Sequence, residues 1–161
     1  MPAAFESGTA DYCTMFEPVA SEYEKAGKGY VVASVGEASG EVPYTCYIAK
    51  ESYIEKNTDT VKGFLRAIMK GIKYINETAS NEAAKYLTAY FDGTDEAAIA
   101  TSLDSYKKID SWQKDMTMTK DSFDRLQDII ENAGELSKRA EFSELVNTEY
   151  STAIYKEVYG L

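Results

Sequence analysis

The chain has 161 residues, of which 44% are hydrophobic and 27% are charged, so it is long enough to bury the core of a soluble domain. Its formal net charge of −10 argues against nucleic acid and anionic membrane surfaces, because both require clustered Lys and Arg. The sequence contains no histidine, which excludes His-based nucleophile pairs and imidazole metal sites within it.

The first forty residues show a pattern typical of an α/β fold. Ala3–Ser7 is predicted to be the last turn of a helix that ends at Gly8, and a second helix is predicted over 18–26. The β-branched run at 30–35 is typical of a strand covered on both faces, and a loop of small residues follows it at 36–40. The three predicted strands cover residues 12–15, 30–35 and 44–49.

The rest of the chain is predicted to be almost wholly helical. Hydrophobic residues at helical spacing predict the clearest helix, from near Thr58 to Ile75. Four more helices are predicted to begin near Ser80, after a cap at Thr94, after a cap at Thr119, and near Thr148. Their predicted inward faces include Ala84, Leu87, Phe91, Ile99, Leu103, Tyr106, Phe123, Leu126, Ile129, Ile130, Tyr150, Ala153, Ile154 and Val158.

The dipeptide Glu17-Pro18 stands where the first predicted strand becomes a helix. Proline suits a first helical turn, and an acid there is favoured by the positive end of the helix dipole. In open α/β folds, ligands bind beyond the carboxyl ends of strands. Glu17 therefore has two interpretations, a residue that complements the helix dipole or an anionic ligand acceptor, with Phe16 as a neighbouring aromatic face.

The two cysteines, Cys13 and Cys46, lie in separate apolar segments. We expect buried free thiols that pack as small apolar groups. A disulfide is the alternative if the two segments are neighbours in an oxidising compartment. The acids of the fourth predicted helix, from Asp121 to Glu131, have helical spacing, which favours a solvated face over a calcium loop.

Three motifs together resemble a known family. They are Gly8-Thr9-Ala10-Asp11 followed by Phe16-Glu17-Pro18, then 42–47 after a glycine-containing crossover, then the helix start at 61–67. The chain resembles the C-terminal half of ABC-transporter solute-binding proteins, in the branch that binds thiamine precursors, alkylsulfonates, taurine or nitrate. Tyr12 takes the place of the small residue usual after the aspartate.

The resemblance implies an α/β fold class, namely a partial type II periplasmic-binding-protein fold with few strands and a helix-rich C-terminal portion. Residues 1–40 would end the second lobe, and 41–161 would comprise the hinge crossover and the C-terminal part of the first lobe. The ligand-binding residues implied are Thr14, Phe16, Glu17, Tyr44 and Thr45. No catalytic residue, metal or cofactor is expected.

The implied function is to bind a small solute and deliver it to an ABC permease. Glu17 would repel sulfonate or nitrate, which favours a neutral or cationic heteroaromatic ligand such as a thiamine pyrimidine precursor. Three alternatives stay open: an anionic ligand, a non-binding fragment that self-associates, and a pyrimidine-related enzyme. A fold relative of the family makes a pyrimidine by consuming its own histidine, which this sequence lacks. The parent protein is expected to be extracytoplasmic, although the chain shows no signal peptide.

Overall fold

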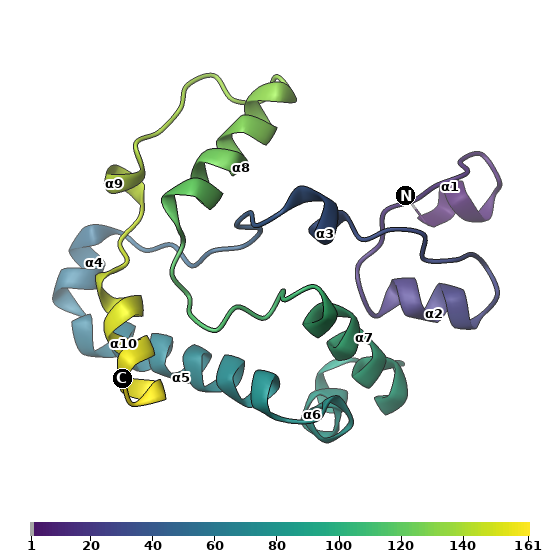
Figure 1. Cartoon of the computed structure of the whole chain (residues 1–161), viewed down its shortest axis with the longest axis horizontal. Coiled ribbons are helices and arrows are strands. Elements are labelled where there is room, and N and C mark those ends of the chain that lie inside the picture. Colours follow the sequence, from purple (N-terminus) through teal and green to yellow (C-terminus); the bar gives the residue numbers. More distant parts are fainter. Residues whose placement is uncertain (1) are drawn as a thin grey trace. The chain divides into compact units, whose positions relative to one another are not determined.

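The computed structural model of the chain describes residues 2–161, which form helices joined by loops (Figure 1). Every helix among those residues is too short or too polar to cross a lipid bilayer. The α-helices are α1 (Pro2–Glu6), α2 (Val19–Lys25), α3 (Val35–Ser39), α4 (Glu51–Lys56), α5 (Thr58–Glu77), α6 (Ser80–Leu87), α7 (Glu96–Lys108), α8 (Lys120–Asn132), α9 (Phe142–Leu145) and α10 (Glu149–Tyr159); a short 3-10 helix, η1 (Thr88–Tyr90), follows α6.

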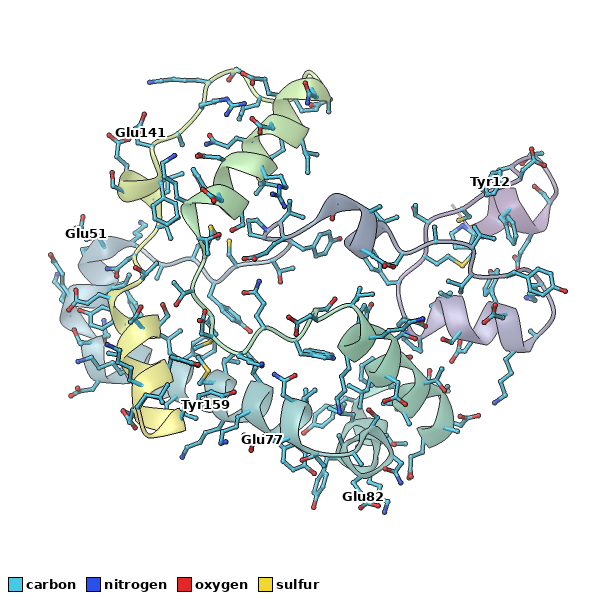
Figure 2. The ribbon with its side chains drawn as sticks, in the orientation of Figure 1. Tyr12, Glu51, Glu77, Glu82, Glu141 and Tyr159 are labelled. Atoms are coloured by element: carbon cyan, nitrogen blue, oxygen red, sulfur yellow. The ribbon has the colours of Figure 1, made fainter. Side chains whose placement is uncertain are left out.

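The α/β fold class predicted from the sequence is wrong for this structure, because residues 2–161 contain no strand. Strand-forming residues give a strand only where a neighbouring segment accepts the ladder of backbone hydrogen bonds. The run at 30–35, predicted to be covered on both faces, instead exposes 86% of Tyr30 and 73% of Val32. Ile48 in the third predicted strand is 90% exposed, and Tyr12 in the first, labelled in Figure 2, is 79% exposed.

Most predicted helices are confirmed. Thr119 caps α8 by accepting a hydrogen bond from the Ser122 amide at 3.1 Å, as expected. The cap of α7 is Asp95 and not Thr94; its carboxylate accepts from the Ala98 amide at 2.7 Å. Helices α3, α4 and α9 were not predicted, since each is only four to six residues long and shows no full hydrophobic period.

Some predicted inward positions are also wrong, among them Ala153 on α10, which is exposed. Phe91 lies beyond the end of α6, which stops at Leu87, and is 40% exposed. Ile129 on α8 is 46% exposed. Both cysteines are free, as expected, but Cys13 is only half-buried and Cys46 is exposed, so the expected burial is not found.

The chain divides into two compact units. The first comprises the residues up to Ala38 together with Ile75–Trp112. Its core is the packing of α6 on α7, where Ala83, Ala84, Ile99 and Leu103 are each less than 5% exposed. Partly buried apolar side chains pack around this cluster: Ile75, Leu87, Ala100 and Trp112.

Two polar contacts hold α7 to the start of α6. The Ser80 hydroxyl donates to the Asp104 carboxylate at 2.5 Å, and Lys107 Nζ donates to the Thr78 carbonyl at 2.6 Å. Both acceptors lie in partly buried surroundings, where an unmade hydrogen bond would be costly. The apolar cluster between α6 and α7, together with these two polar contacts, makes α7 the scaffold of this unit.

The second unit comprises Ser39–Tyr74 and Gln113–Leu161. Here α5 and α10 are joined along their length by charged side chains: Arg66 pairs with Glu157, and the ammonium groups of Lys62 and Lys73 lie over the rings of Tyr150 and Tyr159. The hydrogen bond from Arg66 lowers the pKa of the Glu157 carboxyl. These contacts flank buried apolar residues on each helix, Met69 and Ile154.

Helices α8 and α9 form the other part of the second unit. The rings of Phe123 and Phe142 meet edge to face, with centroids 5.6 Å apart. The buried Gln127 side chain accepts from the Ala140 amide at 2.7 Å and donates to the Ala140 carbonyl. Arg125 lies so close to Gly40 that a Cβ there would come within 2.5 Å of its guanidinium, and Gly40 also has a positive φ of 67°.

We expect Leu103→Ala to destabilise the first unit by about 2–5 kcal/mol, because it opens a cavity between α6 and α7. Urea unfolding followed by the fluorescence of Trp112, the single tryptophan, measures the change. The control is the same substitution at Leu145, which is 68% exposed in the second unit. Equal effects of the two substitutions on the Trp112 transition would contradict the assigned core.

Candidate functional site

The segment before α2 and the helix itself are held against α7 by three polar contacts. The Glu17 amide donates to the Tyr106 hydroxyl at 3.3 Å, near the C-terminal end of α7. Lys25, at the C-terminal end of α2, pairs with Asp95 at 2.9 Å, just before α7 begins. Because the early residue contacts the end of α7 and the late residue contacts its start, α2 runs antiparallel to α7. A hydrogen bond of 3.0 Å from the Thr94 hydroxyl to Glu22 supports the same direction.

Glu17 is half-buried and its carboxylate is partly engaged within the helix. Its Oε2 accepts from the Ser21 amide at 3.1 Å, which satisfies one of the open donors of the first turn of α2. Pro18 occupies the N-cap position, contributes no side-chain hydrogen bond, and is joined to Glu17 by a cis peptide bond. Glu17 therefore does complement the start of the helix, and its other carboxylate oxygen, Oε1, takes no part in this bond.

The two other predicted ligand residues of the first unit lie just before Glu17 in the chain. Phe16 is 66% exposed, and Thr14 is exposed two residues earlier. The structure thus presents an aromatic ring at the surface immediately before a fixed carboxylate. An exposed aromatic face can stack on a flat ring, and a carboxylate can accept hydrogen bonds from it.

The predicted ligand residues Tyr44 and Thr45 belong to the second unit. Tyr44 is 78% exposed and Thr45 is also exposed, and both lie in the loop that precedes α4. Two residues on, the Tyr47 ring meets Phe64 of α5 edge to face with centroids 4.8 Å apart, which ties this loop to the helix.

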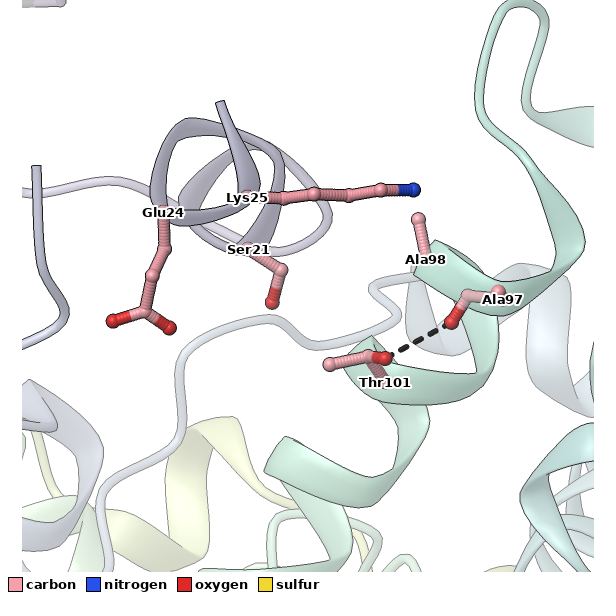
Figure 3. Close-up of a pocket in the computed structure, with 6 residues that line it drawn as sticks. All are labelled: Ser21, Glu24, Lys25, Ala97, Ala98 and Thr101. Carbon is pink, nitrogen blue, oxygen red and sulfur yellow. Dashed lines mark hydrogen bonds between the residues drawn. The ribbon is translucent and has the colours of Figure 1, made fainter. Parts of the chain in front are cut away.

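A groove of about 380 Å³ lies between α2 and α7 (Figure 3). Ala97 and Ala98 of α7 give it an apolar wall. Most of its polar groups already have internal partners: Thr101 donates to the Ala97 carbonyl at 2.9 Å, and Lys25 pairs with Asp95. The residues that line the groove are Ser21, Glu24, Lys25, Ala97, Ala98 and Thr101.

Charges around α2 are paired and mostly exposed. The hydrogen bond from Lys25 lowers the pKa of the Asp95 carboxyl, and the Ala98 amide contributes in the same direction. Lys28 donates to Glu6 at 2.7 Å, which lowers the pKa of the Glu6 carboxyl and raises that of the Lys28 ammonium. The same carboxylate raises the pKa of the Tyr23 phenol.

The acids of α8 are engaged in surface ion pairs. Asp124 pairs with Lys120, and Arg139 bridges Asp128 and Glu131. Such pairs contribute little to stability when exposed, and they agree with the solvated face expected from the sequence. Among residues 2–161, no group of three or more acidic or cysteine side chains has the geometry to hold a metal ion.

Several residues that build the site were not identified as site residues from the sequence. The sequence predicts only that Tyr106 lies on the inward face of its helix, and it predicts no role for Lys25 or Asp95. No local pattern marks Lys25 and Asp95 as partners, because they are separated by 70 positions. No sequence signal links Tyr106 to Glu17 either, because the two residues are 89 positions apart.

Comparison with known proteins identifies two matches. Residues 1–82 match the family described as NMT1/THI5 like. The protein named "Putative binding protein YtlA" from Bacillus subtilis (strain 168) is 41% identical over 154 residues, which cover 96% of this chain. The chain spans about half the length of that relative, 46%. No solved structure matches the chain.

We expect the attachment of α2 to α7 to weaken in acid. Because the folded-state pKa of Asp95 is lowered, the Lys25–Asp95 pair stabilises the folded state above the ordinary aspartate pKa of about 3.9, and this contribution is lost as the pH falls through the lowered value. Lys25→Met should raise the Asp95 pKa toward its ordinary value, which an NMR titration of the side-chain carboxyl carbon measures.

Lys28→Met is the matched control for this titration. It should raise the pKa of Glu6 and leave that of Asp95 in place, because Lys28 donates to Glu6. Identical Asp95 titration curves for the original protein and Lys25→Met would show that the pair does not form.

Proposed function

This chain belongs to the NMT1/THI5 like family, and we propose that it forms part of a solute-binding protein that delivers a small heteroaromatic solute to an ABC permease. Membership confirms the resemblance of the sequence to ABC-transporter solute-binding proteins of this branch. The proposed role is binding and not catalysis. Because the chain spans 46% of its relative, the solute, the permease and an extracytoplasmic location are proposals for the whole protein.

The observation that carries the proposal is the Phe16–Glu17 pair. Glu17 is held at its amide by Tyr106 and at one carboxylate oxygen by Ser21, so its charge has a defined position. Phe16 exposes 66% of its surface beside it. An aminopyrimidine would donate its ring amine to the carboxylate and stack on the aromatic face.

Electrostatics favours a neutral or cationic solute over sulfonate, taurine or nitrate. An anion at this place would be repelled by Glu17. The lysines of the same region are engaged with acids, since Lys25 pairs with Asp95 and Lys28 pairs with Glu6. Their charges are therefore already compensated, and anion binding usually needs Arg or Lys as partners.

We extend the proposal to three further residues. Thr14 is proposed as a polar contact near Phe16, and Tyr44 and Thr45 as contacts from the crossover. The exposure of Tyr44 and Thr45 supports this assignment, because a ligand residue has to be accessible in the empty protein. Lobe closure about a hinge near 41–44 is the mechanism that we propose for trapping the solute.

We expect 4-aminopyrimidine to raise the melting temperature of the protein, and taurine and nitrate to leave it unchanged. A ligand at 100 times its Kd adds about 2.7 kcal/mol, which is about 5–10 °C for a chain of this size. Glu17→Gln should weaken binding about tenfold or more, because a hydrogen bond to a charged group contributes about 1.5–3 kcal/mol. The amide oxygen of Gln still accepts from Ser21, so the fold is kept.

Glu37→Gln is the control for the loss of one negative charge, since Glu37 is exposed on α3 in the same unit. It should leave the melting-temperature shift intact. Stabilisation by taurine or nitrate in place of the aminopyrimidine, or equal binding by Glu17→Gln, would contradict the proposal.

A further inference from the structure

We infer that Tyr106 is a positioning residue of the proposed solute site, because its hydroxyl fixes the backbone of Glu17. The inference rests on the proposed function, which makes Glu17 a ligand contact. It adds a second layer to that site, a residue on α7 that touches no ligand but sets where the carboxylate and the Phe16 ring are held.

The contact itself joins residues 89 positions apart. The Glu17 amide donates to the Tyr106 hydroxyl at 3.3 Å in partly buried surroundings. Glu17 precedes α2 and its amide makes no intrahelical hydrogen bond, so the tyrosine gives this donor a defined partner. Tyr106 is half-buried on α7, and its hydroxyl is the group that contacts the segment carrying Phe16 and Glu17.

Tyr106 is held rigidly enough to act in this way. Its ring meets the indole of Trp112 edge to face, with centroids 5.8 Å apart at 86°. A turn that ends α7 directly follows Tyr106. In this turn the Ser111 amide donates to the Tyr106 carbonyl at 3.0 Å, and the Asp110 amide donates to the Lys107 carbonyl at 3.1 Å. Asp110 adopts the left-handed conformation that such a turn requires, with φ of 54°.

The backbone of Trp112 is held in turn from another element. Asn76, in the last turn of α5, donates its side-chain amide to the Trp112 carbonyl at 2.9 Å. Trp112 Nε1 is buried and has no acceptor among residues 2–161. The order of contacts is therefore Asn76 to Trp112, Trp112 to Tyr106, and Tyr106 to Glu17, all within the first unit.

This order explains why Glu17 has a defined place in an exposed segment. The backbone of Glu17 is held by α7 through Tyr106, and its carboxylate is held by α2 through Ser21. Removal of the hydroxyl alone would free the backbone and leave the helix cap in place. Solute affinity would then fall through loss of positioning, while the aromatic packing on Trp112 would persist.

The test compares Tyr106→Phe with the original protein, because this change removes only the hydroxyl. We expect hydrogen exchange of the Glu17 amide, measured by NMR, to accelerate about two- to tenfold, the range for loss of a typical hydrogen bond. The Kd for 4-aminopyrimidine should weaken by a similar factor. The emission of Trp112 should stay at the same wavelength, because the ring that packs on the indole remains.

Tyr90→Phe is the control, since Tyr90 is 81% exposed in the same unit, and it should change none of the three quantities. Unchanged exchange of the Glu17 amide in Tyr106→Phe overturns the positioning role, whatever the protein binds. Faster exchange with an unchanged Kd overturns its role in solute binding.

An original protein that binds no 4-aminopyrimidine overturns the proposed function, and with it the ligand role of Tyr106. The exchange rate of the Glu17 amide then still shows whether the hydrogen bond itself exists, so the two failures are distinguishable.

Discussion

The antiparallel attachment of α2 to α7 is the constraint on which the candidate site depends. Helix α2 has only seven residues and no buried side chain, so its own burial cannot hold it in place. Polar contacts at both ends do so: Tyr106 with the Glu17 backbone at one end and Asp95 with Lys25 at the other. Helix α7 is itself anchored on α6 by the apolar cluster. The position of the candidate site therefore depends on this buried core of the first unit.

The distribution of charge on the surface also bears on the solute that we propose. The chain carries a formal net charge of −10, and several of its basic groups pair with acids, as Arg66 does with Glu157 and Arg139 with Asp128 and Glu131. Exposed pairs of this kind add little stability, but each one compensates the charge of a cation. A surface of this kind repels anions and favours neutral or cationic solutes. The net negative charge and the Glu17 carboxylate therefore both agree with the neutral or cationic solute that we propose.

Local signals in the sequence predict the helices well and the sheet badly, for a physical reason. The period of the apolar residues in α5 and the cap at Thr119 act within a few residues, and both appear in the structure. A strand depends on a hydrogen-bonded neighbour, so the β-branched run at 30–35 could not by itself ensure one. Tyr30 and Ile48, both highly exposed, show how strand-like sequence remains in loops when no ladder forms.

The candidate site divides in the same way between local and distant interactions. The Glu17-Pro18 motif marked the carboxylate correctly as a residue at a helix start, since the Ser21 amide lies only four positions away. Tyr106 was predicted to face inward, and it does pack on Trp112, but periodicity carries no information about where a hydroxyl on that face will reach. Its partner is set by how α2 lies on α7, which depends on Asp95 and Lys25 far apart in the chain.

The two tasks assigned to Glu17 are compatible because a carboxylate accepts several hydrogen bonds. Oε2 is committed to the Ser21 amide, which fixes the rotamer of the side chain before any solute arrives. Oε1 can then accept from a ligand donor without reorganising the helix, so less conformational entropy is lost on binding. A carboxylate that caps a helix is in this sense already oriented for recognition. The helix-start contact of Glu17 and the ligand contact that we propose for it would therefore use two different oxygens of one carboxylate.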